Sequence, residues 1–309
     1  MIVAMVVPLA VSALLGATAP WLGRRLPPAT TVRLLTVAMV GVALASGFVL
    51  AVAGTLVVGQ IPVVAAEGQW SARALASGLP VPLAVGGVAA VAVAGLLLAA
   101  LRRAALVGRD LVRAARTCRR LGPDVDGLVV IEDDDPDAYA LPGLGGRVVV
   151  STAMLRALPA AERRALLAHE AAHLAHRHHL WVQAASVAAA ANPLLGPVAR
   201  TVATAVERWA DEVAAAEVDD RALVARALAR AGLARTGARR RPRPLALAGA
   251  DHAVADRARA LLAGPPPRRR ALAGALAALL LVVATAVLVT GVDTETRFEA
   301  AESVYAAGH

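Results

Sequence analysis

Long uncharged runs of apolar residues, separated by short polar segments, fill the first third of this chain, and another lies near its end. The four longest runs occupy residues 2–22, 34–58, 81–101 and 271–292. About 20 apolar residues in a helix span the roughly 30 Å hydrocarbon core of a bilayer, so each run predicts a transmembrane helix. The first run lacks the basic segment that precedes a cleaved signal, and we expect it to be retained as a span.

The region between the third and fourth runs is polar and has a mixed pattern. We expect a basic helix over 103–120, and β-branched runs bounded by turn residues predict short strands at 128–132 and 147–151. Further helices are expected at 160–179, 198–217, 219–234 and 251–263, with a Pro/Arg/Gly linker at 236–250. The fold class is therefore a mainly α membrane protein with four transmembrane helices and an α+β domain that holds a small β-sheet. Its predicted parts are a three-span bundle (1–101), the α+β domain (102–265), and a fourth span with a short tail (266–309).

The charge distribution predicts how the chain is oriented. Net charge is +9, and all 32 basic residues are arginine. They gather in 24–33, 102–120 and 239–270, whereas the loop 59–80 holds one. Because basic loops stay in the cytoplasm, we expect a cell-membrane protein with both termini outside and the domain 102–265 cytoplasmic. The arginine clusters could also serve anionic lipid, but topology alone accounts for them. Direct nucleic-acid binding is not expected, since the chain has only two Phe, two Tyr and four Trp for base stacking.

The candidate chemistry lies at His169-Glu170-Ala171-Ala172-His173, an HExxH motif in a stretch of good helix formers. Residues four apart share a helix face, so both imidazoles can hold one metal ion, and Glu170 can reach a water bound to that metal. The alternative interpretation is a polar helix in a histidine-rich region, because His176, His178 and His179 follow directly.

A zinc peptidase needs a third protein ligand and an open position for water. Among the acidic residues after His173, Glu207 and Asp211 share a helix face at i, i+4. Glu207 can act as the ligand, and Asp211 can orient a ligand imidazole. This predicts one zinc ion (Zn2+) per chain; zinc is preferred over other divalent metals on ligand type. Without the upstream motif, a solvated acidic helix face would be the better interpretation.

A further uncharged stretch, residues 180–199, is long enough to resemble a fifth span, although it contains Gln183, Asn192, Pro193 and Pro197. A single crossing would place Glu207 across the membrane from His169, whereas ligands lie about 2 Å from zinc. We therefore expect this stretch either to pack inside the domain or to enter the membrane and return near Asn192-Pro193.

The motifs resemble those of the integral-membrane gluzincins. The sequence HEAAHLAHRHHL, then Asn192-Pro193-Leu194 and ERWAD, is most similar to the antirepressor family that includes the BlaR/MecR-type β-lactam sensor-transducers. Residues 138–143 (AYALPG) and 148–152 (VVVST) are similar to the family of HtpX-type and CAAX prenyl proteases. The resemblance covers about residues 125–262 and also the layout of three spans before the domain and one after it, and it implies a zincin-like (gluzincin) domain.

The resemblance implies roles for individual residues. His169, His173 and Glu207 would bind zinc, Glu170 would be the general base, and Asp211 would orient a ligand. An extended substrate would pair with the strand formed by Arg147, Val148, Val149, Val150 and Ser151. His252 is a candidate oxyanion donor by position, although a surface histidine without a catalytic role is the favoured interpretation.

These expectations describe a membrane-embedded zinc metalloendopeptidase that cleaves a protein or peptide substrate at the cytoplasmic face. The substrate could be a cytoplasmic transcriptional repressor in a signalling circuit or a membrane protein in quality control. The tail 293–309 is shorter than the roughly 40 residues that an unassisted domain needs, so a sensor domain at this end is not expected. A non-catalytic membrane receptor or scaffold that keeps the fold is the alternative, and the intact Glu170 weighs against it.

Overall fold

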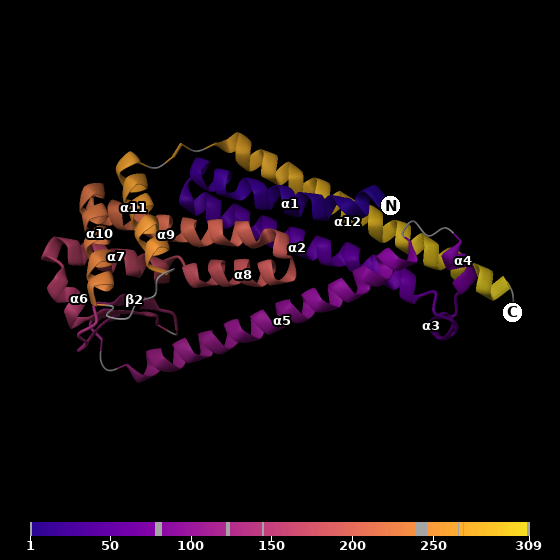
Figure 1. Ribbon diagram of the computed structural model, residues 1–309, viewed down its shortest axis with the longest axis horizontal. Helices are drawn as coiled ribbons and strands as arrows, with labels where there is room; N and C mark the ends of the chain where they lie inside the picture. The colour runs from indigo at the N-terminus through magenta and orange to yellow at the C-terminus, as the bar shows by residue number, and fades with distance from the viewer. Residues whose placement is uncertain are drawn as a thin grey trace.

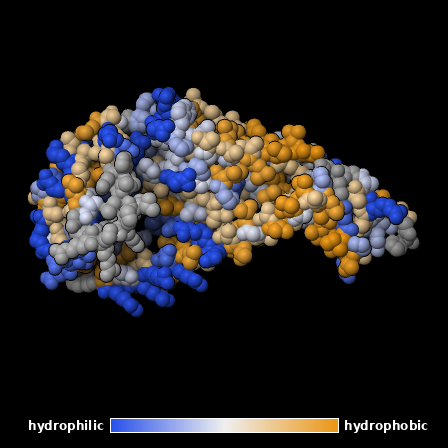
Figure 2. Space-filling view, in the orientation of Figure 1, coloured by the Kyte–Doolittle hydropathy of each residue, from blue (hydrophilic) through white to orange (hydrophobic). Residues whose placement is uncertain are grey.

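A computed structural model of the chain describes residues 2–77, 82–121, 124–143, 145–238, 246–264, 266–267 and 269–307, without the side chains of 237–238 and 246–253. Figure 1 shows an elongated molecule, with long helices side by side and a small sheet at one end. Among the described residues, four helices are long and apolar enough to cross a membrane. They are α1 (Ile2–Arg25), α2 (Pro28–Val58), α5 (Leu83–Arg120) and α12 (Arg270–Ala307). Figure 2 shows that apolar side chains cover the surface of this bundle.

Two of these helices run well beyond the predicted spans. The third predicted span and the basic helix after it form one continuous helix, the 38-residue α5. Likewise, α12 continues through the predicted tail as far as Ala307. Neither junction contains a proline, so nothing in the sequence interrupts the hydrogen-bond ladder. Residues 103–120 are thus helical as predicted, but they continue the third candidate span and do not begin a helix of their own.

The end of the bundle opposite the sheet carries a small cap, which we define as α3 (Pro62–Gly68), α4 (Ala72–Ala76) and the last turns of α12. The Trp70 and Phe298 rings pack edge to face with centroids 5.1 Å apart, and the Ser71 amide donates to the Ala301 carbonyl over 2.9 Å. The loop 59–77 and the end of α12 therefore lie together, far from the sheet (Figure 1).

The described part of the sheet has three strands, in the order β1–β3–β2. They are β1 (Leu128–Ile131), β2 (Ala138–Leu141) and β3 (Arg147–Ser151). β3 pairs in parallel with β1 and antiparallel with β2, so both of its edges are occupied. Arg147–Ser151 therefore offers no open edge for the predicted pairing with a substrate, because the backbone groups of β3 already bond within the sheet. The strand β2 was not predicted as an element.

The remaining helices surround the sheet and enter the bundle. They are α6 (Thr152–Ala157), α7 (Ala160–Ala175), α8 (His178–Ala191), the short 3-10 helix η1 (Pro193–Leu195), α9 (Gly196–Val218), α10 (Arg221–Ala238) and α11 (Ala246–Ala263). The predicted helix 160–179 ends early, because Arg177 adopts a left-handed conformation (φ 50°) that starts a new helix. α11 begins inside the predicted linker, whose residues 239–245 lie outside the described residues.

The uncharged stretch 180–199 forms a helical hairpin and makes no single crossing. The chain runs along α8, turns at Asn192, and returns along α9, with both helices packed against α2. At the turn, the Asn192 amide donates to the Ser12 and Ser46 hydroxyls of α1 and α2 over 2.8 and 3.1 Å. One apolar core joins this hairpin to the long helices; it includes Leu15, Leu35, Met39, Leu195 and Val198. Since α9 carries Glu207, the hairpin positions the candidate metal centre relative to the bundle.

Candidate metal centre

Two neighbouring helices supply the predicted metal-site residues. α7 carries His169, Glu170 and His173, and α9 carries Glu207 and Asp211. Residues four apart lie on the same face of a helix, so each pair faces the other helix across the α7–α9 contact. His169, Glu170 and Asp211 are buried. The Ala165 and Ala168 side chains of α7 pack against Ala214 and Ala215 of α9, and such small residues permit close approach of the two helices.

Three side chains converge as a ligand set would. The Nε2 atoms of His169 and His173 lie 3.1 Å apart, and the Glu207 carboxylate oxygens lie 3.6 Å and 3.7 Å from these two nitrogens. Ligand atoms held tetrahedrally at 2.0–2.2 Å from zinc lie roughly 3.3–3.5 Å from one another. Two imidazoles and a carboxylate are also a donor set that zinc accepts. The residues present therefore fit a zinc ion, and among the described residues they form a group that could hold a metal.

The second nitrogen of each imidazole also has a neighbour. His169 Nδ1 lies 3.0 Å from Asp211 Oδ1, and His173 Nδ1 lies 3.1 Å from Nδ1 of the buried His178. Such contacts fix the orientation and tautomer of a ligand imidazole. Both rings are therefore held with Nε2 toward Glu207.

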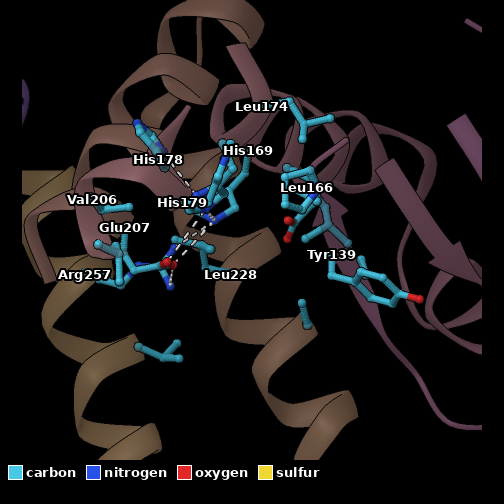
Figure 3. Close-up of a pocket in the computed structure, with 18 of the residues that line it drawn as sticks. Tyr139, Leu166, His169, Leu174, His178, His179, Val206, Glu207, Leu228 and Arg257 are labelled. Atoms are coloured by element: carbon cyan, nitrogen blue, oxygen red, sulfur yellow. Dashed lines mark hydrogen bonds and ion pairs between the residues drawn. The ribbon is translucent and has the colours of Figure 1, made fainter. Parts of the chain in front are cut away.

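Arg257 of α11 closes the site from the other side. Its guanidinium donates to both oxygens of Asp211, over 2.8 and 2.6 Å, and pairs with Glu207 at 3.1 Å. Figure 3 shows His169, Glu207 and Arg257 gathered in this network. A planar guanidinium matches carboxylate geometry, so Arg257 fixes both acidic side chains at once.

The charges in the site shift the pKa values of its groups. Burial lowers the pKa of His169, but Asp211 and Glu207 outweigh burial and raise it to about 9. Burial lowers the pKa of His173 to about 4. Burial raises the pKa of Glu207, but His169 and Arg257 together bring it down to about 2. Burial is also the largest cause of the raised pKa of Glu170, as expected for a carboxyl in a desolvated position.

A cleft of about 430 Å³ opens onto this cluster. His169, Glu170, His173 and Glu207 line it together with the β2 strand. Within the described part of the chain, β2 pairs only with β3, so no strand occupies its other edge. The Ser151 amide bonds to the Asp137 carbonyl, and the alternation of an antiparallel ladder then turns the backbone groups of Ala138 and Ala140 toward that edge. Arg235 of α10 donates to the Ala138 carbonyl over 2.8 Å.

The structure thus brings five predicted residues together: His169, Glu170, His173, Glu207 and Asp211. The predicted substrate strand is separate, since none of the described residues 147–151 lines the cleft. Ser151 instead caps α6 through a bond from the Met154 amide. The side chain of His252 lies outside the described residues.

Sequence reasoning missed Arg257, His178 and the β2 edge. Arg257 lies 46 residues after its partner Asp211, and no local motif marks it. In the sequence, His178 is only one more histidine in a histidine-rich region. Its contact with His173 depends on the left-handed turn at Arg177 that separates α7 from α8. The AYALPG segment was noticed through a resemblance, which did not show that it forms the free edge.

Comparison with known proteins gives one match. No curated protein and no solved structure matched the chain. The family model described as Peptidase family M48 matches residues 102–303, about two thirds of the chain, including the HExxH helix, the Glu207 helix and most of α12. The chain therefore belongs to peptidase family M48.

Proposed function

We propose that this protein is a membrane-embedded zinc metalloendopeptidase. Its family implies metallopeptidase activity. The observation that supports the proposal best is the meeting of two imidazole Nε2 atoms and the Glu207 carboxylate in a cleft that Glu170 also lines.

We assign His169, His173 and Glu207 as the ligands of one zinc ion. When bound, zinc supplies Lewis acidity toward a water molecule and the scissile carbonyl. Glu170 takes the proton from the attacking water and passes it to the leaving amine. Its raised pKa suits this work, because a general base is most effective when its pKa approaches the working pH. Asp211 and His178 orient the two imidazoles, and Arg257 holds Asp211 and Glu207 in place.

The free edge of β2 gives an extended substrate a place to bind. The outward backbone groups of Ala140 can pair with a peptide that adds to the sheet as a further strand. Such pairing would lay the peptide along the cleft beside His169 and Glu170. We therefore move the proposed substrate strand from Arg147–Ser151 to Ala138–Leu141.

We propose that the metal centre faces the cytoplasm. Arg24 and Arg25 end α1, Arg33 lies in the second turn of α2, and Arg270 begins α12. These basic residues belong to the ends of the spans nearest the domain, and the positive-inside rule places such ends in the cytoplasm.

For the substrate, we propose a protein at the membrane surface, with a cytoplasmic transcriptional repressor as the leading candidate. The support is the resemblance of the motifs, and of the layout of three spans before and one after, to the BlaR/MecR-type antirepressors. Quality control of membrane proteins is the alternative use of the same site.

The test is metal content and peptide cleavage by the detergent-purified protein beside its Glu170→Gln variant. We expect one zinc per chain in both proteins and a loss of cleavage of about 10²–10⁴-fold in the variant, the usual contribution of a general base. Glu217→Gln, an exposed change on α9, serves as the matched control and should cleave normally. Metal-free wild-type protein, or an active Glu170→Gln variant, would overturn the proposal.

A further inference from the structure

A second cavity, of about 760 Å³, lies beside the metal cleft in a groove between α1, α9 and α11. We call it the arginine groove. Four of the described arginines line it, namely Arg24, Arg200, Arg208 and Arg257. Its volume falls within the range of small-molecule sites. Arg257 also lines the metal cleft, so its side chain separates the two cavities.

Of the four arginines that line the groove, Arg257 alone pairs with carboxylates in the part of the chain that the structure describes. Among the described residues, neither Arg24 nor Arg200 has an acidic partner. Arg208 donates from one nitrogen to the Gly23 carbonyl over 3.0 Å. The acidic residue in the described lining, Asp256, pairs with Arg259. The Thr201 and Thr204 side chains lie on the same wall. Guanidinium groups bind phosphate oxygens through paired hydrogen bonds, so this lining matches a phosphate.

The position of the arginine groove along the long axis of the helix bundle indicates which kind of molecule carries that phosphate. Arg24 lies in the last turn of α1, at the boundary between its apolar stretch and the domain. Trp21, one turn earlier, is 42% exposed, as tryptophans at the bilayer interface often are. Phospholipid headgroups lie at this level of a bilayer. Pro20, Pro197 and Ala205 give the groove an apolar part beside its arginines, and Pro20 of α1 is exposed, which suits the start of an acyl chain.

We infer that the arginine groove binds the phosphate of an anionic phospholipid from the leaflet on the side of the metal centre. Basic pockets between transmembrane helices bind such headgroups by the same charge complementarity. Because Arg257 borders both cavities, a bound headgroup would lie next to the residue that holds Asp211 and Glu207. The inference goes beyond the proposed peptidase activity and does not depend on it.

The test measures lipid binding to the delipidated full chain in a neutral detergent, by native mass spectrometry, with phosphatidylglycerol against phosphatidylcholine. We expect the wild type to bind phosphatidylglycerol preferentially. Arg24→Gln/Arg200→Gln should weaken that binding by roughly tenfold or more, since each arginine near a headgroup contributes substantially. Arg25→Gln/Arg102→Gln removes the same charge on the same side and should bind normally, because Arg25 stacks on Trp21 and Arg102 is exposed on α5.

Single substitutions of Arg200 and competition with inorganic phosphate test the assignment further. Arg200→Gln alone should weaken binding partly, whereas Arg200→Lys should retain most of it. Unchanged phosphatidylglycerol binding in the double groove variant, or equal losses in groove and control variants, would overturn the inference. Displacement of the lipid by millimolar inorganic phosphate would assign the groove to a soluble anion and would overturn it as well. Because the readout is lipid occupancy, a failure here is distinguishable from a failure of the peptidase proposal.

Discussion

The side chains of the metal centre balance one another before any metal binds. Two carboxylates, Glu207 and Asp211, face two cations, Arg257 and the protonated ring of His169. One proton assignment satisfies the imidazole contacts: His169 Nε2–H donates to His173 Nε2, and His173 Nδ1–H donates to His178 Nδ1. His173 is then neutral, in agreement with its low pKa. A metal ion entering this site therefore replaces a proton.

That exchange predicts proton release on zinc binding. The pKa of His169 is raised from 6.5 to about 9, so its ring is charged at neutral pH. The stabilisation from this charge is complete below pH 6.5 and is lost as the pH rises through about 9. Coordination needs a neutral ring, so near pH 7.5 the His169 ring should release about one proton for each zinc bound, in addition to any proton lost by a water on the zinc. Titration calorimetry in two buffers of different ionisation enthalpy measures this number. Identical heats in both buffers near pH 7.5 would contradict it.

Asp211 should matter for metal affinity although it is not assigned as a ligand. Asp211→Asn keeps the shape of the side chain but removes the charge that holds His169 Nδ1 and Arg257. We expect zinc affinity to fall by about 10–100-fold, the usual effect of such outer contacts. Competition with a chromogenic chelator gives the affinity. Glu212→Gln, one residue along the helix and paired with Arg221 away from the site, is the control and should bind zinc normally.

At the scale of elements, the α8–α9 hairpin attaches the metal centre to the bundle. It packs against α1, α2 and α5, and its turn is held by the buried Asn192 side chain between Ser12 and Ser46. A further bond joins Arg103 of α5 to Ser186 of α8 over 3.0 Å. The described sheet contributes one wall of the cleft through its edge strand β2. Its central strand, β3, does not line the cleft.

We therefore expect Asn192→Ala to destabilise the protein. The change removes the amide that donates to both buried hydroxyls and the Oδ1 that accepts from the Leu194 amide, which costs about 1–3 kcal/mol. The midpoint of thermal unfolding in detergent should drop accordingly. Thr204→Ala removes an exposed hydroxyl that bonds only within α9, and its midpoint should stay near that of the wild type. A midpoint for Asn192→Ala equal to that of Thr204→Ala would show that the turn does not anchor the hairpin.

The molecule has two different ends joined by long helices. The metal centre and the arginine groove occupy one end, and the cap of α3, α4 and α12 occupies the other (Figure 1). α2 and α12 reach the cap, and α12 follows α11, which carries Arg257. If the chain spans a bilayer through its four apolar helices, these ends lie on opposite sides.

Labelling with a membrane-impermeant maleimide tests this arrangement. The native Cys118 is buried and is replaced by alanine in the parent protein. In intact cells we expect labelling of a cysteine placed at Glu302, near the end of α12, and not of one placed at Asp134, beside the sheet. Lysis should make both positions reactive. Labelling of both positions, or of Asp134 alone, in intact cells would contradict the proposed orientation.

Much of this protein was determined by its sequence alone. The four candidate spans followed from apolar length, because a bilayer imposes a fixed thickness on any helix that crosses it. His169, Glu170 and His173 followed from helical spacing, because residues four apart share a face. Glu207 and Asp211 followed from the same rule once a third ligand was required.

Only the tertiary structure decided the rest, since it depends on packing between residues that are distant in the sequence. It placed Arg257 against Asp211, His178 against His173 across a left-handed turn, and Asn192 between two spans. It also assigned the free sheet edge to β2, because strand order is set by pairing and not by the composition of a strand. The arginine groove likewise exists only where α1, α9 and α11 meet, although each of its arginines can be read in the sequence.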